Sequence, residues 1–379
     1  MKKVLKFFKN NIIFAIVVVI ALISCIFVPF DKQYLDYFEL NTLSCIFLLL
    51  LIIAGFANIQ FFEKVARFVV KKFKNTRSII MCLIFVTYIS ALINANDMSL
   101  LTFLPLAYIV LKYTNNLRYC AFTFIMQNIA SNLGGMLVPT GNPQNLFIFS
   151  FYKMSLWEFL KIMAIPTLIA LVLIIIVCMF IKKEPLVYED NADKKLDIKR
   201  AVIYGVLYLI TLLVVLRVIP WWIALIGIPI VMAVCDWKAF LGVDYTVPLT
   251  FVCFFIFSGN MARIPAITNL MESFVEKYTY ITAYISCNLI SNVPTAVLLS
   301  KFTNNYAQLL VSVNVASLGI IFSSLSGVIA LKEYTKVVRK EKLSKKRGVW
   351  YYIGLDTLFN VVGALILVPL SYWSLMLIL

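Results

Sequence analysis

The sequence contains no histidine among its 379 residues. That absence excludes histidine-ligated metal sites, Ser–His and Cys–His catalysis, and histidine proton relays. Cysteine offers no alternative chemistry, because its eight copies stand singly in apolar stretches without a Cys-x-x-Cys pair, as small buried hydrophobic residues do. We therefore expect neither an enzyme nor a protein with a cofactor or a transition metal.

Charge is also scarce. Only 14% of the residues are charged and 62% are hydrophobic, whereas a soluble domain has about 25% charged and about 45–50% apolar residues. A net charge of +16 would suggest nucleic acid as the partner of a soluble protein. Here the cations lie in short runs between long apolar stretches, which is the positive-inside pattern of membrane proteins. The sequence therefore predicts the lipid bilayer, and no nucleic acid, as a partner.

Apolar stretches of about 20 residues, the length of a membrane-spanning helix, recur along the chain. The first follows four lysines within residues 1–10 and lacks a signal-peptide cleavage site, so we expect a retained helix with a cytoplasmic N-terminus. Three basic loops are placed on the cytoplasmic side: 64–77, 182–200 and 332–347. The acidic loop 30–39 is placed outside, and the loop 236–246, with one lysine and two aspartates, weakly opposes its cytoplasmic placement. The predicted location is the plasma or inner cell membrane, with several spans.

Two apolar stretches, 78–112 and 279–302, are interrupted midway by polar residues. The first is too long for one helix, the second has the same interrupted form, and each is too short for two spans, so we expect re-entrant hairpins with their tips at mid-depth. Irregular backbone at that depth is tolerated only where it faces protein or a water-filled cavity, which makes the tips candidate sites. The tip residues are Asn94, Asn96 and Asp97 in the first hairpin, and Ser291, Asn292 and Thr295 in the second.

A stretch that does not fit one helix follows each hairpin, at about 118–152 and 305–331. Between Asn132 and Asn145 the first stretch holds three glycines and two prolines, which break a helix. Unwound carbonyls suit Na⁺ or a proton-carrying water, and a half-helix N-terminus suits an anion. The candidate side chains there are Thr140, Asn142, Gln144 and Asn145. The second stretch has Ser323, Ser324 and Ser326 but no proline, so its break is the weaker prediction.

The two halves of the chain share a pattern. Tyr88-Ile89-Ser90 returns as Tyr284-Ile285-Ser286, and residues 128–134 resemble residues 314–319 with one residue dropped. The loop charges place the two hairpins on opposite sides, so we predict inverted repeats, which indicate an alternating-access secondary transporter. The predicted fold is an all-α polytopic membrane protein with four parts: an N-terminal helix and external loop (1–39), a first repeat (40–181), connecting segments (182–246) and a second repeat (247–379).

Asp97 is the clear acid at hairpin-tip depth. A carboxylate there costs about 2.5–3.5 kcal/mol on insertion scales, so it is functional by default and should face a cavity. It could bind Na⁺, accept a proton or pair with hydroxyls and amides opposite. Asp356, in the last span, is expected to lie close enough to the cytoplasmic end to be solvated.

With these residues the chain resembles the ion-transporter superfamily, which includes citrate and dicarboxylate permeases, arsenite/antimonite permeases and a sodium/proton antiporter branch. The resemblance covers residues 40–376 and rests on Asn96-Asp97 with Pro105 downstream, the Gly-Gly…Pro-Thr-Gly-Asn-Pro-Gln-Asn run ending at Asn145, and Ser-Asn-Val-Pro-Thr at 291–295. It implies inverted repeats, hairpin tips that meet the unwound helices around one substrate site, Na⁺ or H⁺ coupling, and a homodimer.

The resemblance also implies roles for single residues. The cation-binding residues are then Asn94, Asn96, Asp97, Asn292 and the backbone near Gly134 and Ala316. Substrate would lie between the tips, against Asn96, Asp97, Thr140, Asn142, Gln144, Asn145, Ser291, Asn292 and Thr295. Dicarboxylate members carry Ser-Asn-Thr at both tips, whereas the first tip here is Asn-Asp, nearer to the arsenite-permease and antiporter branches. A carboxylate beside a di- or tricarboxylate repels it unless it is protonated or paired with a cation.

We therefore expect a secondary active transporter that is coupled to Na⁺ or H⁺ and moves a small anion or oxyacid, citrate-transporter-like, by alternating access. Arsenite/antimonite efflux and Na⁺/H⁺ antiport are the alternatives within this class. An ion channel, with flux far above carrier turnover, is an alternative from another class. An intramembrane aspartyl protease would need a facing acid and a Gly-x-Gly-Asp signature, and Gly354-Leu355-Asp356 lacks the first glycine.

Overall fold

The computed structural model describes residues 12–61, 64, 72–93, 96–185, 196–266, 274–343 and 347–378. These residues form helices, and the described ranges contain no β-strand beyond an isolated bridge between Asn75 and Pro185. The helices are α2 (Ile12–Phe27), η1 (Lys32–Tyr37), α3 (Leu40–Asn58), α5 (Thr76–Ile93), α6 (Asn96–Tyr113), η2 (Leu117–Tyr119), α7 (Cys120–Gly135), α8 (Pro143–Phe151), α9 (Leu156–Met179), α10 (Ile198–Val215), α11 (Trp221–Asp236), α12 (Lys238–Gly242), α13 (Thr246–Met261), α15 (Thr279–Ile290), α16 (Asn292–Leu299), α17 (Tyr306–Val315), η3 (Ile321–Ser323), α18 (Leu325–Lys340) and α19 (Val349–Met376). The predicted all-α fold is confirmed.

Five helices are long and apolar enough to cross a membrane by length and composition: α3, α5, α9, α10 and α19. The longest, α19, has 28 residues, about 42 Å at the usual rise per residue. α9 begins with a capping box, in which Ser155 accepts a hydrogen bond from the Glu158 backbone and the Glu158 carboxylate accepts one from the Ser155 backbone. That exchange satisfies two of the orphan groups at a helix start. The chain is a multi-pass membrane protein.

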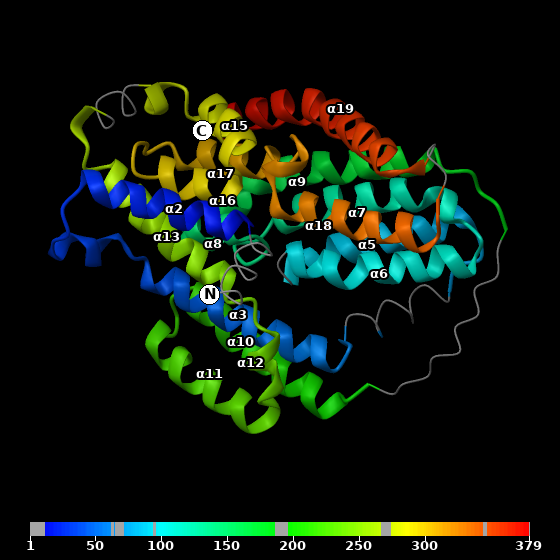
Figure 1. The fold of residues 1–379 in the computed structure, drawn as a ribbon, viewed down its shortest axis with the longest axis horizontal. Coiled ribbons are helices and arrows are strands. Elements are labelled where there is room, and N and C mark those ends of the chain that lie inside the picture. Colours follow the sequence, from blue (N-terminus) through cyan, green and yellow to red (C-terminus); the bar gives the residue numbers. More distant parts are fainter. Residues whose placement is uncertain are drawn as a thin grey trace.

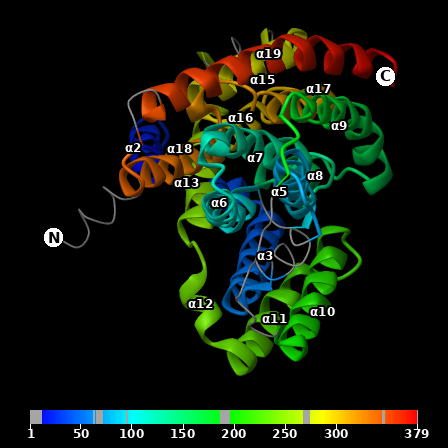
Figure 2. The same ribbon diagram turned by 90° about the vertical axis from the view of Figure 1, so that its right-hand side faces the viewer.

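The helices form two groups (Figures 1 and 2). In the first group α3 packs against α10, α11 and α12, while α13 packs against α2 and α3. The second group holds α5–α9 and α15–α19, with α19 along its outer edge. The groups meet where α16 contacts α13 and where α3 contacts α8.

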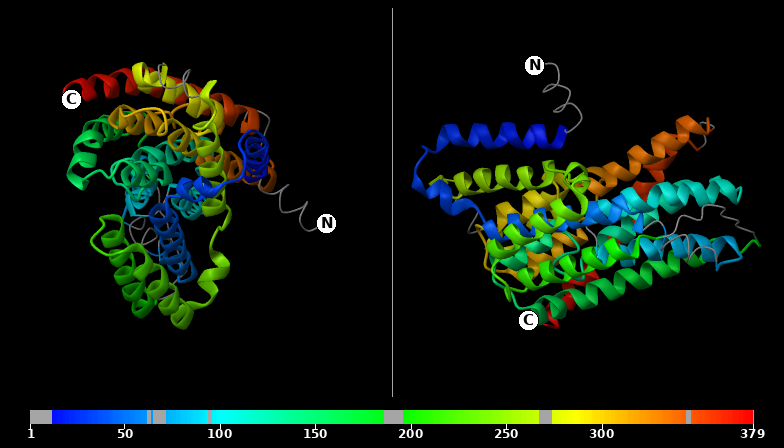
Figure 3. Two further views of the ribbon diagram at one scale, coloured as in Figure 1. Left: turned by 90° about the vertical axis from the view of Figure 1, so that its left-hand side faces the viewer. Right: turned by 90° about the horizontal axis from the view of Figure 1, so that it is seen from below.

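The two hairpins open toward opposite ends of α9. The first hairpin, α5 and α6, has its base at the end of α9, where Arg77 Nε donates to the Ile181 carbonyl oxygen over 2.8 Å. The second hairpin, α15 and α16, has its base near the start of α9, where the Tyr152 hydroxyl donates to the Thr303 carbonyl oxygen over 2.8 Å. α9 has 24 residues, so the two bases are about 36 Å apart along it. The view from below shows this separation (Figure 3).

The hairpin arms differ in length. α5 and α6 have 18 residues each, so α5 reaches the length of a span, which is more than the sequence led us to expect. α15 and α16 have 12 and 8 residues and stay well short of it. Asn94 lies outside the described residues, so its predicted place at the first tip is not described.

Both helices that follow the hairpins are discontinuous. The first is broken between α7 and α8, as its prolines and glycines predict, and the second between α17 and α18. The second break needs no proline because side chains of α15 hold it. The Tyr284 hydroxyl donates to the Leu318 carbonyl oxygen over 2.9 Å, and Asn288 Oδ1 accepts from the Ile320 backbone over 3.0 Å. A β-carbon at Gly319 would lie 2.0 Å from Asn288 Oδ1, so a larger residue there would push the Asn288 side chain away from the Ile320 backbone.

Candidate functional site

Asn96, the first residue of α6, ties the first hairpin tip to the broken helix. Its side-chain N–H donates to Asn132 Oδ1 over 2.9 Å, and its Oδ1 accepts from the Asp97 backbone over 3.0 Å. Asn132 in turn donates to the Asn128 carbonyl oxygen over 3.0 Å. The Ser326 hydroxyl of α18 donates to the same Asn132 Oδ1 over 3.0 Å. One amide therefore joins the first tip, the first broken helix and the helix beyond the second break.

A second set of amides crosses from one break to the other. Asn142, in the unwound segment 136–142, donates to Asn314 Oδ1 over 3.1 Å. Asn314, in the last turn of α17, donates to Asn145 Oδ1 over 2.6 Å. Asn145 closes the unwound segment by donating to the carbonyl oxygens of Gly135, Met136 and Val138 at 3.2, 3.3 and 3.3 Å. All three amides are buried, inside an otherwise apolar protein. Together with Asn96 and Asn132, to which Asn142 is linked through the Asn132 carbonyl oxygen, they form what we call the amide layer.

The close approach within the first break depends on glycine. A β-carbon at Gly141 would lie 2.1 Å from the Gly135 carbonyl oxygen, and one at Gly134 would lie 2.5 Å from the Tyr88 carbonyl oxygen of α5. Neither backbone atom can move aside like a flexible side chain. The glycines of the motif therefore let the chain fold back on itself and rest on the first hairpin.

Asp97 lines a cavity next to the amide layer. The cavity has a volume of about 80 Å³ and is walled mainly by aliphatic side chains of α3, α6, α8, α13 and α18. Thr140 of the unwound segment and Asp244, in the turn before α13, also line it. Asp97 Oδ1 is buried and has no hydrogen-bond partner within the described ranges. The sequence prediction that Asp97 faces a cavity agrees with this placement, while its role stays a prediction.

The second tip is built around a strained residue. Ser291 has φ 75° and ψ 165°, a region that L-residues rarely occupy and that costs on the order of 1–3 kcal/mol. Its carbonyl oxygen accepts a hydrogen bond from the Thr295 hydroxyl over 2.9 Å. Asn292 is buried, and in the part of the chain that is described its Oδ1 has no hydrogen-bond partner. α16 packs against α8, so this tip approaches the first broken helix without a described hydrogen bond to the amide layer.

The two lysines at the hairpin ends, Lys112 and Lys301, are held away from the tips. Lys112 Nζ lies 2.7 Å from Glu341 Oε1 at the base of the first hairpin. Lys301 Nζ lies 4.9 Å from the centre of the Phe151 ring, a cation–π contact. The described side chains of the amide layer are neutral, and the acidic residues beside it are Asp97 and Asp244.

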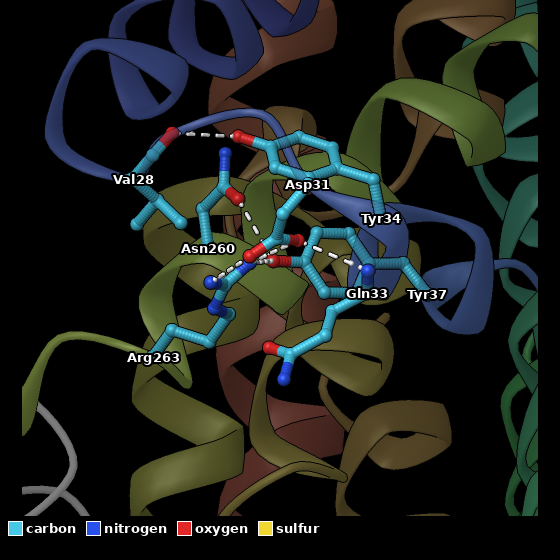
Figure 4. Close-up of polar contacts among 7 residues, drawn as sticks. All are labelled: Val28, Asp31, Gln33, Tyr34, Tyr37, Asn260 and Arg263. Carbon is cyan, nitrogen blue, oxygen red and sulfur yellow. Dashed lines mark hydrogen bonds and ion pairs between the residues drawn. The ribbon is translucent and has the colours of Figure 1, made fainter.

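A separate polar cluster joins the N-terminal segment to the end of α13 (Figure 4). Arg263 donates to both carboxylate oxygens of Asp31, at 3.0 and 2.5 Å, and to the Tyr37 hydroxyl at 3.1 Å. The Tyr37 hydroxyl donates to Asn260 Oδ1 over 3.1 Å. The hydrogen bonds from Arg263 lower the pKa of Asp31 below its usual value. The cluster runs from the exposed Asp31 to the buried Tyr37 and Asn260 and attaches η1 to the end of α13.

The structure brings together most of the residues that the sequence singled out. Asn96, Asn142 and Asn145 share the amide layer, Asp97 and Thr140 share the cavity, and Ser291, Asn292 and Thr295 form the second tip. Gln144 and Ala316 are buried beside the two breaks, and Gly134 packs on α5. These positions do not test the binding roles, which stay predictions.

Sequence reasoning left three polar residues of this region out of its candidate site. Asn132 stood in the motif, and Asn314 matched Asn128 in the repeat, so both carried a signal. Asp244 carried a weaker one, because the acids of the loop 236–246 already fitted a cytoplasmic loop poorly. All three are placed at the site by tertiary contacts.

The expectation for Asp356 was wrong. The residue is 1% exposed and lies on the inner face of α19, where Asn360 donates to its Oδ2 over 3.0 Å. The ring of Tyr352, one turn earlier on the same face, stacks on Tyr334 of α18. Position along the span suggested solvation, but the packing of α18 and α7 on this face removes the carboxyl from water.

The structure has the features of a membrane transporter. It has helices of span length, two discontinuous helices beside helical hairpins, and buried amides where the two breaks meet. The chain belongs to the CitMHS citrate transporter family, whose family model matches residues 2–327. It is 30% identical over 321 residues to the uncharacterized transporter MJ0456 of Methanocaldococcus jannaschii, covering 84% of this chain and 88% of that protein. It is 26% identical over 352 residues to the inner membrane protein YbiR of Escherichia coli (strain K12), covering 89% of each. The resemblance noted in the sequence is confirmed.

Proposed function

We propose that the protein is a secondary active transporter that moves a small anion or oxyacid by alternating access and couples this movement to H⁺ or Na⁺. The observation that carries the proposal is the buried amide layer, in which Asn142 and Asn314 join the two helix breaks. Asparagine side chains and unwound carbonyls are the groups that bind substrates and coupling ions in such transporters. The family model, described as citrate transporter, supports a carboxylate or similar anion as substrate.

The coupling role is assigned to Asp97. Its buried Oδ1 has no partner within the described ranges and belongs to a side chain that faces a cavity. An unpaired carboxylate in a low-dielectric site binds a proton or another cation readily. Neutralisation of Asp97 by that cation would also remove the repulsion between its carboxylate and an anionic substrate.

Cation exchange without an organic substrate is the second candidate. The side chains of the amide layer are neutral, and Lys112 and Lys301 at the hairpin ends are held away from it. A di- or tricarboxylate would therefore have no positive partner among the described residues of this site. This favours a small or weakly charged substrate, such as an oxyacid, or Na⁺/H⁺ antiport. A homodimer in the cell membrane with a cytoplasmic N-terminus completes the proposal.

Two experiments test the proposal. Citrate, succinate, arsenite, phosphate and sulfate are each added to detergent-purified protein, with and without Na⁺, and a substrate should raise the thermal unfolding midpoint because it binds the folded state. Uptake of that substrate into proteoliposomes should depend on an imposed H⁺ or Na⁺ gradient, and Asp97→Asn should abolish this dependence. Asp36→Asn, at an exposed aspartate of η1, is the control. Unchanged gradient dependence in Asp97→Asn would refute the coupling role.

If the unfolding midpoint moves with none of the five anions, cation exchange becomes the leading function. In that case a pH-sensitive dye inside the proteoliposomes reports Na⁺-driven proton movement. The same two variants apply, and Asp97→Asn should stop the exchange while Asp36→Asn should not.

A further inference from the structure

Asp244 places a second carboxylate on the Asp97 cavity. Its Oδ1 accepts hydrogen bonds from the Thr246 backbone over 3.0 Å and from the Thr246 hydroxyl over 2.5 Å. These bonds fix the side chain at the start of α13. Asp244 is exposed, whereas Asp97 Oδ1 is buried. The cavity therefore has one acid at its mouth and one in its interior.

The remaining lining supplies no charge to balance these acids. The described side chains from α3, α5, α8, α13 and α18 that face the cavity are aliphatic, and no lysine, arginine, tyrosine or cysteine is among them. Tyr208 of α10 is not among the residues that line the cavity. Asp97 and Asp244 both line this cavity, and a negative charge nearby disfavours the ionised form of a carboxyl group, so a proton or a cation bound here is stabilised.

The chemistry of the lining favours a proton over a sodium ion. Among the described residues that line the cavity, three have side chains with oxygen, namely Asp97, Thr140 and Asp244. Sodium sites in transporters draw further oxygens from unwound backbone, whereas a proton needs one carboxylate oxygen at a time. A volume of about 80 Å³ also leaves room for a water molecule in the cavity.

We propose that Asp244 and Asp97 form a proton pair, in which Asp244 takes up the proton at the mouth of the cavity and Asp97 holds it in the interior. The proton leaves one carboxylic oxygen and binds the other, directly or through a water molecule, so the pair keeps one negative charge throughout. Asp244 lies before α13 in the helix group around α3, whereas Asp97 lies on the first hairpin. The pair therefore spans the two helix groups, and a relative movement of the groups would connect or separate the two acids.

This inference deepens the proposed function and rests on it, and the test keeps the two apart. Infrared difference spectra of the purified protein, titrated with pH, follow the band of protonated buried carboxyl groups. Asp97→Asn should remove the signal of the interior acid. Asp244→Asn should keep that signal but move its midpoint to lower pH by on the order of one unit, a tenfold change in proton affinity, because a neighbouring negative charge is removed. The optimum of proton-driven uptake into proteoliposomes should move in the same direction.

The control is Asp197→Asn. Asp197 is also exposed and its carboxylate also accepts from a backbone N–H near the start of a helix, that of Arg200 in α10, yet it is not among the residues that line the cavity. The amide oxygen of asparagine can accept the same backbone hydrogen bond, so both substitutions remove a charge with little effect on folding. If Asp244→Asn elutes as aggregate, Asp244→Glu keeps the charge and should reproduce the wild-type titration.

Each outcome decides one question. If the infrared titration of Asp244→Asn superimposes on those of wild type and Asp197→Asn, the proposed Asp97–Asp244 proton pair is overturned. This holds even if Asp97→Asn abolishes the gradient dependence, as the proposed function requires. Gradient dependence that survives in Asp97→Asn overturns the proposed function itself. Loss of the wild-type carboxyl signal on addition of NaCl at constant pH would show that Na⁺ is the occupant, and would overturn the assignment of a proton.

Discussion

Substitution of Asn314 tests whether the amide layer holds the two halves together. Asn314 is 1% exposed and exchanges hydrogen bonds with two residues of the other half, accepting from Asn142 at 3.1 Å and donating to Asn145 at 2.6 Å. Asn314→Ala removes both bonds. Asn142 keeps its longer bond to the Asn132 carbonyl oxygen at 3.4 Å, but Asn145 Oδ1 loses the donor that Asn314 supplies.

The expected magnitude follows from these losses. Side-chain hydrogen bonds in membrane proteins contribute about 0.6 kcal/mol each on average, so two lost bonds cost about 1.2 kcal/mol. A buried acceptor left without a donor adds about 1–3 kcal/mol. We therefore expect Asn314→Ala to lower the free energy of unfolding by about 2–4 kcal/mol in total.

Reversible unfolding in mixed detergent and SDS micelles measures this change. A double-mutant cycle with Asn145→Ala isolates the bond between the two side chains, and its coupling energy should fall within about 0.5–3 kcal/mol. Thr211→Val is the control, because the Thr211 hydroxyl is also buried and its hydrogen bond within the described ranges goes to the Leu207 carbonyl oxygen of its own helix. A coupling energy indistinguishable from zero would refute the claim that this layer joins the halves.

Two further predictions concern acids outside the amide layer. The hydrogen bonds from Arg263 lower the pKa of Asp31 from 3.8, so they stabilise the fold above that pH, and this stabilisation is lost as the pH falls through the lowered pKa. Asp31→Asn should reduce the thermal midpoint at neutral pH and match wild type in acid; an equal deficit at both would contradict the ion pair. At Asp356, the variant Asp356→Asn keeps an acceptor for Asn360, so it should stay near wild type, whereas Asp356→Leu should lose about 1–3 kcal/mol. Unfolding midpoints in detergent compare the two, and a leucine variant as stable as the asparagine variant would disprove this role of the hydrogen bond.

The sequence predicted the broken helices with unequal success. Three glycines and two prolines marked the first break, because these residues forbid helix wherever they stand in the chain. The second break has no proline and is held by Tyr284 and Asn288 of α15. Those contacts join residues about 30 positions apart, so local composition could not reveal them.

The acidic residues show the same difference between what local sequence reveals and what tertiary packing decides. Asp97 was recognised because a carboxylate within an apolar stretch is expensive, a cost that depends on its immediate neighbours in the chain. The burial of Asp356 depends on which face of α19 packs inward, and the cavity position of Asp244 depends on the turn before α13 and the first hairpin bordering the same cavity. Neither position depends on local sequence, so from the sequence we wrongly expected Asp356 to be solvated and did not include Asp244 in the site.

By itself, then, the sequence determined the class of this protein: an all-α polytopic membrane protein whose interrupted stretches resemble those of ion transporters. It could do so because hydrophobic length, loop charge and helix-breaking residues act locally. The tertiary structure decided which polar groups meet, since Asn96, Asn132, Asn142, Asn145 and Asn314 become neighbours only when the helices pack. Buried polar groups require partners, and those partners come from distant parts of the chain.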